Sequence, residues 1–138
     1  MRKIKEIIVH CSATREGKPF TVADIDRWHR ARGWKGCGYH YVITLDGKVE
    51  QGRPEQIAGA HCSGRNSDSI GVCYVGGCDL VGKSKDTRTE AQKNAMRTLV
   101  RSLMQTHGIS IDNVRCHNEF SSRACPSFSI EKLRKELE

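Results

Sequence analysis

Two histidines and one cysteine, near opposite ends of the chain, are the residues whose types and spacing could do chemistry together. His10 ends an apolar, β-branched run, Ile4 to Val9, and His117 follows a second run that ends at Cys116. Cys125 comes eight positions after His117 in a loop-like segment. If the two runs are neighbouring strands, the three side chains can meet at one edge of a sheet.

Two imidazoles and a thiolate suit zinc, and three protein ligands leave its fourth tetrahedral position open to water. Such an open site is typical of hydrolases, because the metal lowers the pKa of its water to about 7 and polarises a carbonyl group. Spacing alone does not single out this triple, since Cys73, Cys78 and Cys116 could also contribute to a zinc site. Cys73 lies in an apolar run, so it is expected to be a core residue, as is Cys11.

The segments that must position these residues alternate between strands and helices. Five apolar or alternating runs predict strands, at residues 4–9, 39–44, 48–51, 70–77 and 112–116. Helical spacing of apolar residues predicts three helices, at residues 22–32, 90–107 and 130–137. This order favours an α/β fold, with a central mixed sheet flanked by helices on both sides. No linker or repeat is visible, so residues 1–138 are expected to form a single domain.

Capping residues set the ends of the two longer predicted helices. Thr21 with Asp24, and Thr89 with Gln92, have the spacing of N-terminal capping boxes. Glycines stand where each of these helices should end, at positions 33 and 108.

The chain carries a net charge of +7, which indicates attraction to an anionic partner. That partner could be nucleic acid, an acidic membrane or a cell-wall polymer, and a basic surface that only aids solubility is an equal alternative. We expect no nucleic-acid partner, because no basic helix carries interleaved aromatic side chains of the kind that stack on bases. We expect no membrane insertion, because no apolar run approaches the roughly 20 residues that span a bilayer.

Seven cysteines are many for 138 residues, yet the opening MRKIKEIIVH lacks the apolar run and cleavage site of a secretory signal. We therefore expect the chain to be cytoplasmic as synthesised, in a reducing compartment where cysteines are metal-binding, catalytic or buried rather than paired.

Several segments together carry a resemblance to a known family: VHCSAT (9–14), WHRARGW (28–34), GYHYVI (38–43), DGKVEQGR (46–53), GAHCSGRNSDSIGVCYVGG (59–77), TEAQ (89–92), CHNEF (116–120) and ACPSF (124–128). In this order, and over nearly the whole chain, they resemble the zinc-dependent N-acetylmuramoyl-L-alanine amidases. That family includes small phage lysozyme-amidases and, more distantly, peptidoglycan recognition proteins. The resemblance implies a central mixed sheet with helices around it, and hydrolysis of the amide between N-acetylmuramic acid and L-alanine in peptidoglycan. Residues 1–138 would then be a single catalytic amidase domain.

The resemblance also implies roles for particular residues. The family's zinc ligands fall on His10, His117 and Cys125, with one Zn²⁺ per chain. A tyrosine that assists at the metal falls on Tyr39, where a phenol can hydrogen-bond the water or the developing oxyanion. In the phage enzymes a catalytic lysine stands two positions before the cysteine, and this chain has Arg123 there. Arginine stays charged, so it can stabilise an oxyanion but cannot readily transfer a proton.

The remaining histidines are expected to differ in role. His61, together with Asn66, matches a family segment that lines the substrate groove, so both are expected to contact substrate. His40 follows Tyr39 on a predicted strand, so its side chain points to the opposite face. It is expected to be a packing residue or to support the site. His29 and His107 lie on predicted helices and are expected to be structural.

Two alternatives come with the resemblance. Some peptidoglycan recognition proteins bind the glycan peptide without cleaving it, but non-catalytic relatives typically lack the sulfur ligand, which this chain keeps as Cys125. Some phage amidases also regulate an RNA polymerase, so such a partner is an alternative by family analogy only. Otherwise we expect a monomer of the phage or prophage lysis type, with peptidoglycan as its partner, that acts on the cell wall after release.

Overall fold

The central feature of the fold is a mixed five-stranded sheet with the strand order β4-β3-β5-β1-β7. The computed structural model describes residues 2–138. The strands of this sheet are β1 (Glu6–Cys11), β3 (Tyr41–Ile43), β4 (Val49–Gln51), β5 (Ser69–Tyr74) and β7 (Val114–Cys116). β1 pairs in parallel with both β5 and β7, β3 pairs in parallel with β5, and only β4 is antiparallel to its neighbour. A small second sheet pairs β2 (Thr14–Arg15) with β6 (Gly77–Cys78).

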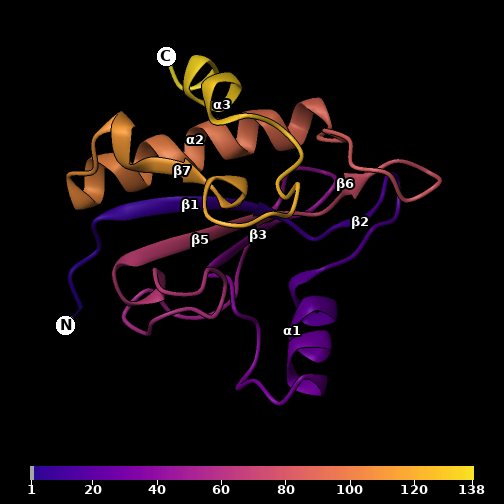
Figure 1. Cartoon of the computed structure of the whole chain (residues 1–138), viewed down its shortest axis with the longest axis horizontal. Coiled ribbons are helices and arrows are strands. Elements are labelled where there is room, and N and C mark those ends of the chain that lie inside the picture. The colour runs from indigo at the N-terminus through magenta and orange to yellow at the C-terminus, as the bar shows by residue number, and fades with distance from the viewer. Residues whose placement is uncertain (1) are drawn as a thin grey trace.

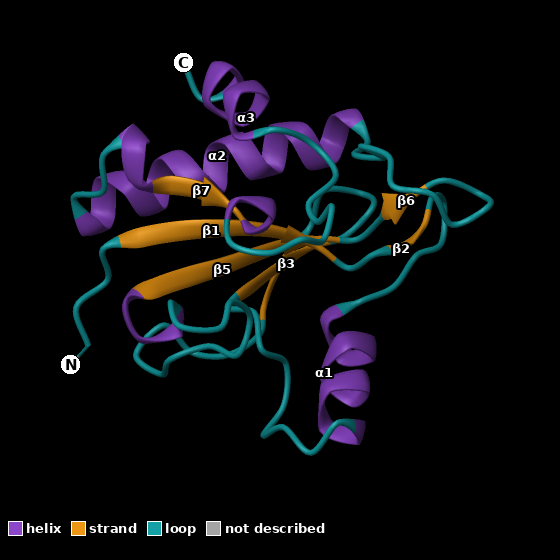
Figure 2. Ribbon diagram, in the orientation of Figure 1, coloured by secondary structure: helices purple, strands orange, loops and turns teal. Residues whose placement is uncertain are grey.

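Helices cover both faces of the sheet, as predicted. α2 (Glu90–His107) and α3 (Ile130–Glu136) lie on one side and α1 (Val22–Ala31) on the other (Figures 1 and 2). The larger core lies under α2 and α3, and the smaller core under α1. Among residues 2–138, no helix has both the length and the apolar character needed to cross a membrane.

The alternation of side chains along β1 determines which residues point into the larger core and which point to the opposite face of the sheet. Ile7 and Val9 pack into the larger core, against residues of α2 such as Met96 and Val100. Since successive side chains of a strand point to opposite faces, His10 points away from that core. The apolar residues of β1 therefore anchor the strand while its histidine is presented on the other face.

The capping boxes form at both predicted positions. At the start of α2, the Thr89 hydroxyl accepts the N–H of Gln92 and the Gln92 side chain accepts the N–H of Thr89, each at 3.0 Å. At the start of α1, the Asp24 carboxylate accepts the Thr21 N–H at 2.8 Å. α2 ends at Gly108, whose φ of +64° is the left-handed conformation that glycine adopts without strain.

The strand boundaries differ from the prediction. β1 begins and ends two residues later than expected, because its pairing with β5 continues as far as Cys11 opposite Tyr74. β3 is shorter than expected, so Tyr39 precedes it in an irregular segment. β5 stops at Tyr74, and the residues before β7 form a 3₁₀ turn at Ile111–Asn113. These boundaries depend on pairing between distant segments, which local sequence does not encode.

Candidate functional site

His10, His117 and Cys125 meet at one point in the structure. Their potential ligand atoms all lie within 4.8 Å of one another, and the His10 and His117 ring centroids are 4.5 Å apart. The sheet register explains this convergence. β1 and β7 are parallel neighbours in which Val9 lies opposite Cys116, so the next residue of each segment, His10 or His117, stands at the same level of the sheet.

Hydrogen bonds from two strands hold the loop that carries Cys125. The Tyr74 hydroxyl of β5 donates to the Pro126 carbonyl at 2.7 Å, and the Cys11 N–H of β1 donates to the Cys125 sulfur at 3.1 Å. The side-chain hydrogen bond with Cys11, and then burial, raise the pKa of the Cys125 thiol. The thiol of the metal-free protein is therefore protonated, and its proton must leave when a metal binds.

Both imidazoles of the trio are neutral at physiological pH. The pKa of His10 is held well below its usual value by burial, and further by the neighbouring His61 and His117. Burial also lowers the pKa of His117, with a smaller effect from the positive charge of Arg123. A neutral imidazole offers a lone pair, which is what a metal requires. Within residues 2–138, the buried Nδ1 of His117 has no hydrogen-bond partner, so its lone pair is available.

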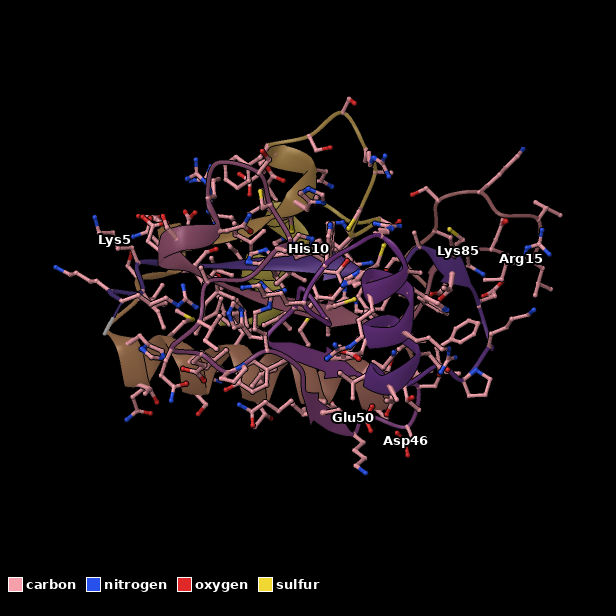
Figure 3. All side chains as sticks on the ribbon, turned by 90° about the horizontal axis from the view of Figure 1, so that it is seen from below. Lys5, His10, Arg15, Asp46, Glu50 and Lys85 are labelled. Carbon is pink, nitrogen blue, oxygen red and sulfur yellow. The ribbon has the colours of Figure 1, made fainter. Side chains whose placement is uncertain are left out.

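His117 and Cys125 line a cleft of about 740 Å³, and His10 lies buried beside them. The walls of the cleft come from α1, from the loop after β6, from the segment between β4 and β5, and from the Cys125 loop. Figure 3 shows His10 near the middle of the molecule, with Lys5 toward one end and Arg15 and Lys85 toward the other. The cleft is large enough for a ligand of several rings or residues.

Tyr39 lies beside the trio, with its ring centroid 5.1 Å from that of His10. It lines the cleft. Burial, and then the sulfurs of Cys73 and Cys125, raise the pKa of the Tyr39 hydroxyl well above its usual value. The hydroxyl therefore stays protonated and can act as a hydrogen-bond donor in the cleft.

Arg123 stands on the rim of the cleft, two residues before Cys125. Its side chain is exposed, and its charge lowers the pKa of His117, which shows that the guanidinium acts on the trio electrostatically. A permanent positive charge at this rim attracts anionic ligands and stabilises negative charge that develops nearby.

His61 and Asn66 also line the cleft. The Asn66 side-chain oxygen accepts the backbone N–H groups of His61 and Cys62, both at 2.9 Å, and so fixes the loop. The His61 ring contacts the trio directly, since its Nδ1 lies 2.8 Å from the Nε2 of His10. Burial, and then nearby positive groups including His40, lower the pKa of His61 to about 3.

The other histidines have hydrogen-bond partners in the protein, and His29 also lines the cleft. His29 Nδ1 accepts the N–H of Gly38 at 2.8 Å, His40 Nδ1 accepts the N–H of Gly71 at 3.0 Å, and His107 lies 2.8 Å from a carboxylate oxygen of Glu55.

The alternative cysteine sites do not form in the part of the chain that the structure describes. The one cluster of potential metal ligands found there is the trio described above. Cys73 and Cys116 are fully buried core residues, and Cys11 is also buried, while all seven cysteines are free. The reading of Cys73 and Cys11 as core residues is therefore confirmed.

Sequence reasoning missed the wall of the cleft formed by α1 and the segment after it. Trp28 and Arg32 line the cleft from the helix, and Trp34 lines it from the following turn. Helical spacing predicted the helix at residues 22–32, but spacing alone does not show that part of this helix lines a cleft. Trp34 is 36% exposed in the structure, and no signal in the sequence distinguished it as part of a cleft wall.

Comparisons with known proteins agree with this arrangement. A family model described as N-acetylmuramoyl-L-alanine amidase matches residues 1–128. The endolysin of Escherichia phage T7 is 42% identical over 126 residues, which cover 91% of this chain and 82% of that protein. Peptidoglycan-recognition protein SC2 of Drosophila melanogaster is 31% identical over 99 residues, 71% of this chain and 51% of that protein. The solved N-acetylmuramoyl-L-alanine amidase LysC from Clostridium intestinale superposes with a TM-score of 0.83 at 28% identity, covering 99% of this chain and 86% of LysC.

Proposed function

The chain belongs to the N-acetylmuramoyl-L-alanine amidase family, and from that premise we propose that it cleaves the bond between N-acetylmuramic acid and L-alanine with one zinc ion held by His10, His117 and Cys125. It is an amidase similar to phage endolysins, and peptidoglycan is its substrate. The proposal adds the metal, the bond that is cut and the residues that act, within a single catalytic domain spanning residues 1–138.

One observation carries the proposal: three donor atoms of the types that zinc prefers lie within 4.8 Å of one another at the cleft. The donor set fits the ion, because two neutral nitrogens and a thiol that can lose its proton balance much of the charge of Zn²⁺. The unpartnered Nδ1 of His117 supports the fit. Zinc, when bound, supplies a Lewis acid that activates water and polarises the substrate carbonyl.

Two side chains of the protein, Tyr39 and Arg123, are proposed to stabilise the charge that develops in the reaction. The Tyr39 hydroxyl, which stays protonated, donates a hydrogen bond to the oxygen on which negative charge develops. Arg123 stabilises the same charge from the rim, and because it cannot readily give up a proton, it is not the general acid. Proton transfer to the leaving amine then depends on Tyr39, on the attacking water or on the substrate itself.

His61 and Asn66 are proposed to contact the glycan peptide in the cleft. The Asn66 amide oxygen is occupied by two backbone N–H groups, which leaves its amide N–H groups to donate to substrate. Both ring nitrogens of His61 lie within hydrogen-bond distance of protein atoms, so its substrate contact is through the ring surface.

Digestion of purified sacculi by the full chain tests this function. Mass spectrometry should find stem peptides with a free L-alanine amino group and no new reducing sugar ends. A chelator should stop the release, and added Zn²⁺ should restore it. Metal analysis that finds no zinc in untreated protein, or digests that contain cleaved sugar linkages, would refute the proposal.

Two further functions are weighed against this one. A recognition module that only binds peptidoglycan is less favoured, because the sulfur donor completes a set of three ligands at the cleft. An RNA polymerase partner stays a prediction by family analogy, tested by mixing purified polymerase with the chain. We also propose that the chain is a monomer and acts on the cell wall after release from the cytoplasm, and light scattering in solution tests the first point.

A further inference from the structure

A series of hydrogen bonds leads from His10 through His61 to the start of β5. His10 Nε2 lies 2.8 Å from His61 Nδ1, with the two rings perpendicular and 4.8 Å apart. His61 Nε2 lies 3.2 Å from the Ser69 hydroxyl oxygen, and that hydroxyl donates to the Arg65 carbonyl at 2.7 Å. These hydrogen bonds thus run from β1 to the start of β5 and the segment before it.

The hydrogen bond from Ser69 to the Arg65 carbonyl fixes which group is the donor and which the acceptor in the other two hydrogen bonds. A carbonyl oxygen only accepts, so Ser69 must give its single proton to Arg65 and must accept a proton from His61 Nε2. A neutral imidazole carries one N–H, so His61 Nδ1 has a lone pair and accepts the N–H of His10 Nε2. By the same rule His10 then has its lone pair on Nδ1, the ring nitrogen left free to bind a metal.

The protein fits closely around the His61 ring, which keeps it in this position. A Cβ atom added at Gly71 would lie 2.7 Å from two carbon atoms of the ring, and one added at Gly59 would lie 2.6 Å from its Cδ2. Ser69 is fully buried, and the Asn66 side chain fixes the His61 backbone. The ring is therefore packed closely against two glycines, and both of its nitrogens have hydrogen-bond partners.

We propose that His61 and Ser69 are positioning residues that hold His10 in the Nε2–H tautomer, with Nδ1 presented to zinc. This inference rests on the proposed metal site and assigns His61 a role that does not depend on substrate. Residues that orient a metal-bound histidine in this way typically change metal affinity 10- to 100-fold when they are removed.

A matched pair of substitutions at His61 tests the inference. In His61→Asn the side-chain oxygen can take the place of Nδ1 and still accept from His10, whereas in His61→Gln the amide reaches toward Ser69 and the acceptor for His10 is lost. Zinc affinity is measured by chelator competition with zinc alone, in the absence of peptidoglycan. We expect His61→Gln to bind zinc about 10- to 100-fold more weakly than wild type and His61→Asn to stay close to wild type.

Nitrogen-15 NMR of the histidine rings in the metal-free wild-type protein gives a second readout that needs no substitution. His10 should carry its proton on Nε2 and His61 should carry its proton on Nε2. Equal zinc affinity in wild type and both variants would overturn the inference, as would a proton on His10 Nδ1. If the wild-type protein binds no zinc at all, the proposed function fails instead, so the two failures are distinguishable.

Discussion

Cys11 donates its backbone N–H to the sulfur of Cys125 across 3.1 Å, so strand β1 holds a donor atom from the far end of the chain. An N–H group aimed at a sulfur favours the thiolate, and the thiolate is the form that binds metals. The donor is a main-chain group, so it is present whatever side chain stands at position 11.

Cys125→Ser should lower zinc affinity by more than about 100-fold, beyond the loss typical of a residue that only supports a ligand, because a hydroxyl is a much poorer zinc ligand than a thiolate. Amidase activity should fall with it. Cys11→Ala is the matched control, because it removes the neighbouring sulfur and keeps the N–H donor, so zinc should still bind. Both are measured by chelator competition and by metal content after dialysis.

Tyr39→Phe should retain zinc and lose turnover. The phenol lies beside His10, and the three clustered donors come from His10, His117 and Cys125, so its removal leaves these donors intact. Loss of one donor to a developing oxyanion costs on the order of 100-fold in kcat. Activity on soluble muramyl peptides, measured beside zinc content, separates the two effects, and an unchanged kcat would exclude Tyr39 from the reaction.

Arg123→Lys should retain activity at neutral pH and add an alkaline limb to the pH–rate profile. Lysine keeps the positive charge at the rim of the cleft but loses its proton within a range where arginine does not. Arg123→Gln should be slower at every pH, because the charge is gone. Identical profiles for wild type and Arg123→Lys would show that the charge at this position does not act on the reaction.

The stability of the metal-free protein should fall in mild acid, in part through His29. Its pKa is lowered from 6.5 to about 4 by burial, and then by the charges of Arg32 and Arg53. The unfolded chain therefore takes up this proton first, so the contribution is complete above pH 6.5 and is lost as the pH falls from 6.5 toward 4. Thermal melts across this range should show a smaller decline in His29→Asn, whose amide oxygen can still accept the Gly38 N–H. An equal decline in both proteins would assign the effect to other groups.

Arg88→Met should destabilise the fold by about 1–3 kcal/mol, because it removes a buried guanidinium from the partly buried carboxylates of Asp86 and Glu136. The Arg88 side chain is fully buried, pairs with Asp86 and Glu136, and stacks on the Phe128 ring at 4.0 Å. Urea unfolding of the metal-free protein measures the loss. Arg97→Met is the control: its guanidinium bonds the Glu138 carbonyl at the surface, so its removal should change stability by less than about 0.5 kcal/mol.

The sequence predicted the helices better than the strands, for a physical reason. Capping boxes at Thr21 and Thr89 and the glycine at position 108 act within a few residues, so the ends of the helices follow from local sequence. The extent of β1 depends on β5, which lies about 60 residues away along the chain, as its pairing shows. Strand order and the end of β1 at Cys11 therefore required the structure.

For the site, strand ends and the family resemblance together identified His10, His117 and Cys125, and the structure brings these three side chains together. The contact between His61 and His10 could not be predicted in the same way. It joins two segments that are not adjacent in sequence, and it depends on the space left by glycines such as Gly71. The aromatic wall of the cleft was missed because a helical stripe looks the same whether it covers a core or a groove.

The parallel pairing of β1 with β7 would give the proposed metal site a role in assembly as well as in hydrolysis. The two imidazoles come from opposite ends of the chain and meet only when the last strand has joined the sheet. An ion that requires both is a cross-link that closes a very long loop, and its binding free energy adds to the stability of the native state alone. If zinc binds as proposed, its occupancy would report whether the chain has finished folding, and newly made protein would gain resistance to unfolding as it binds the metal.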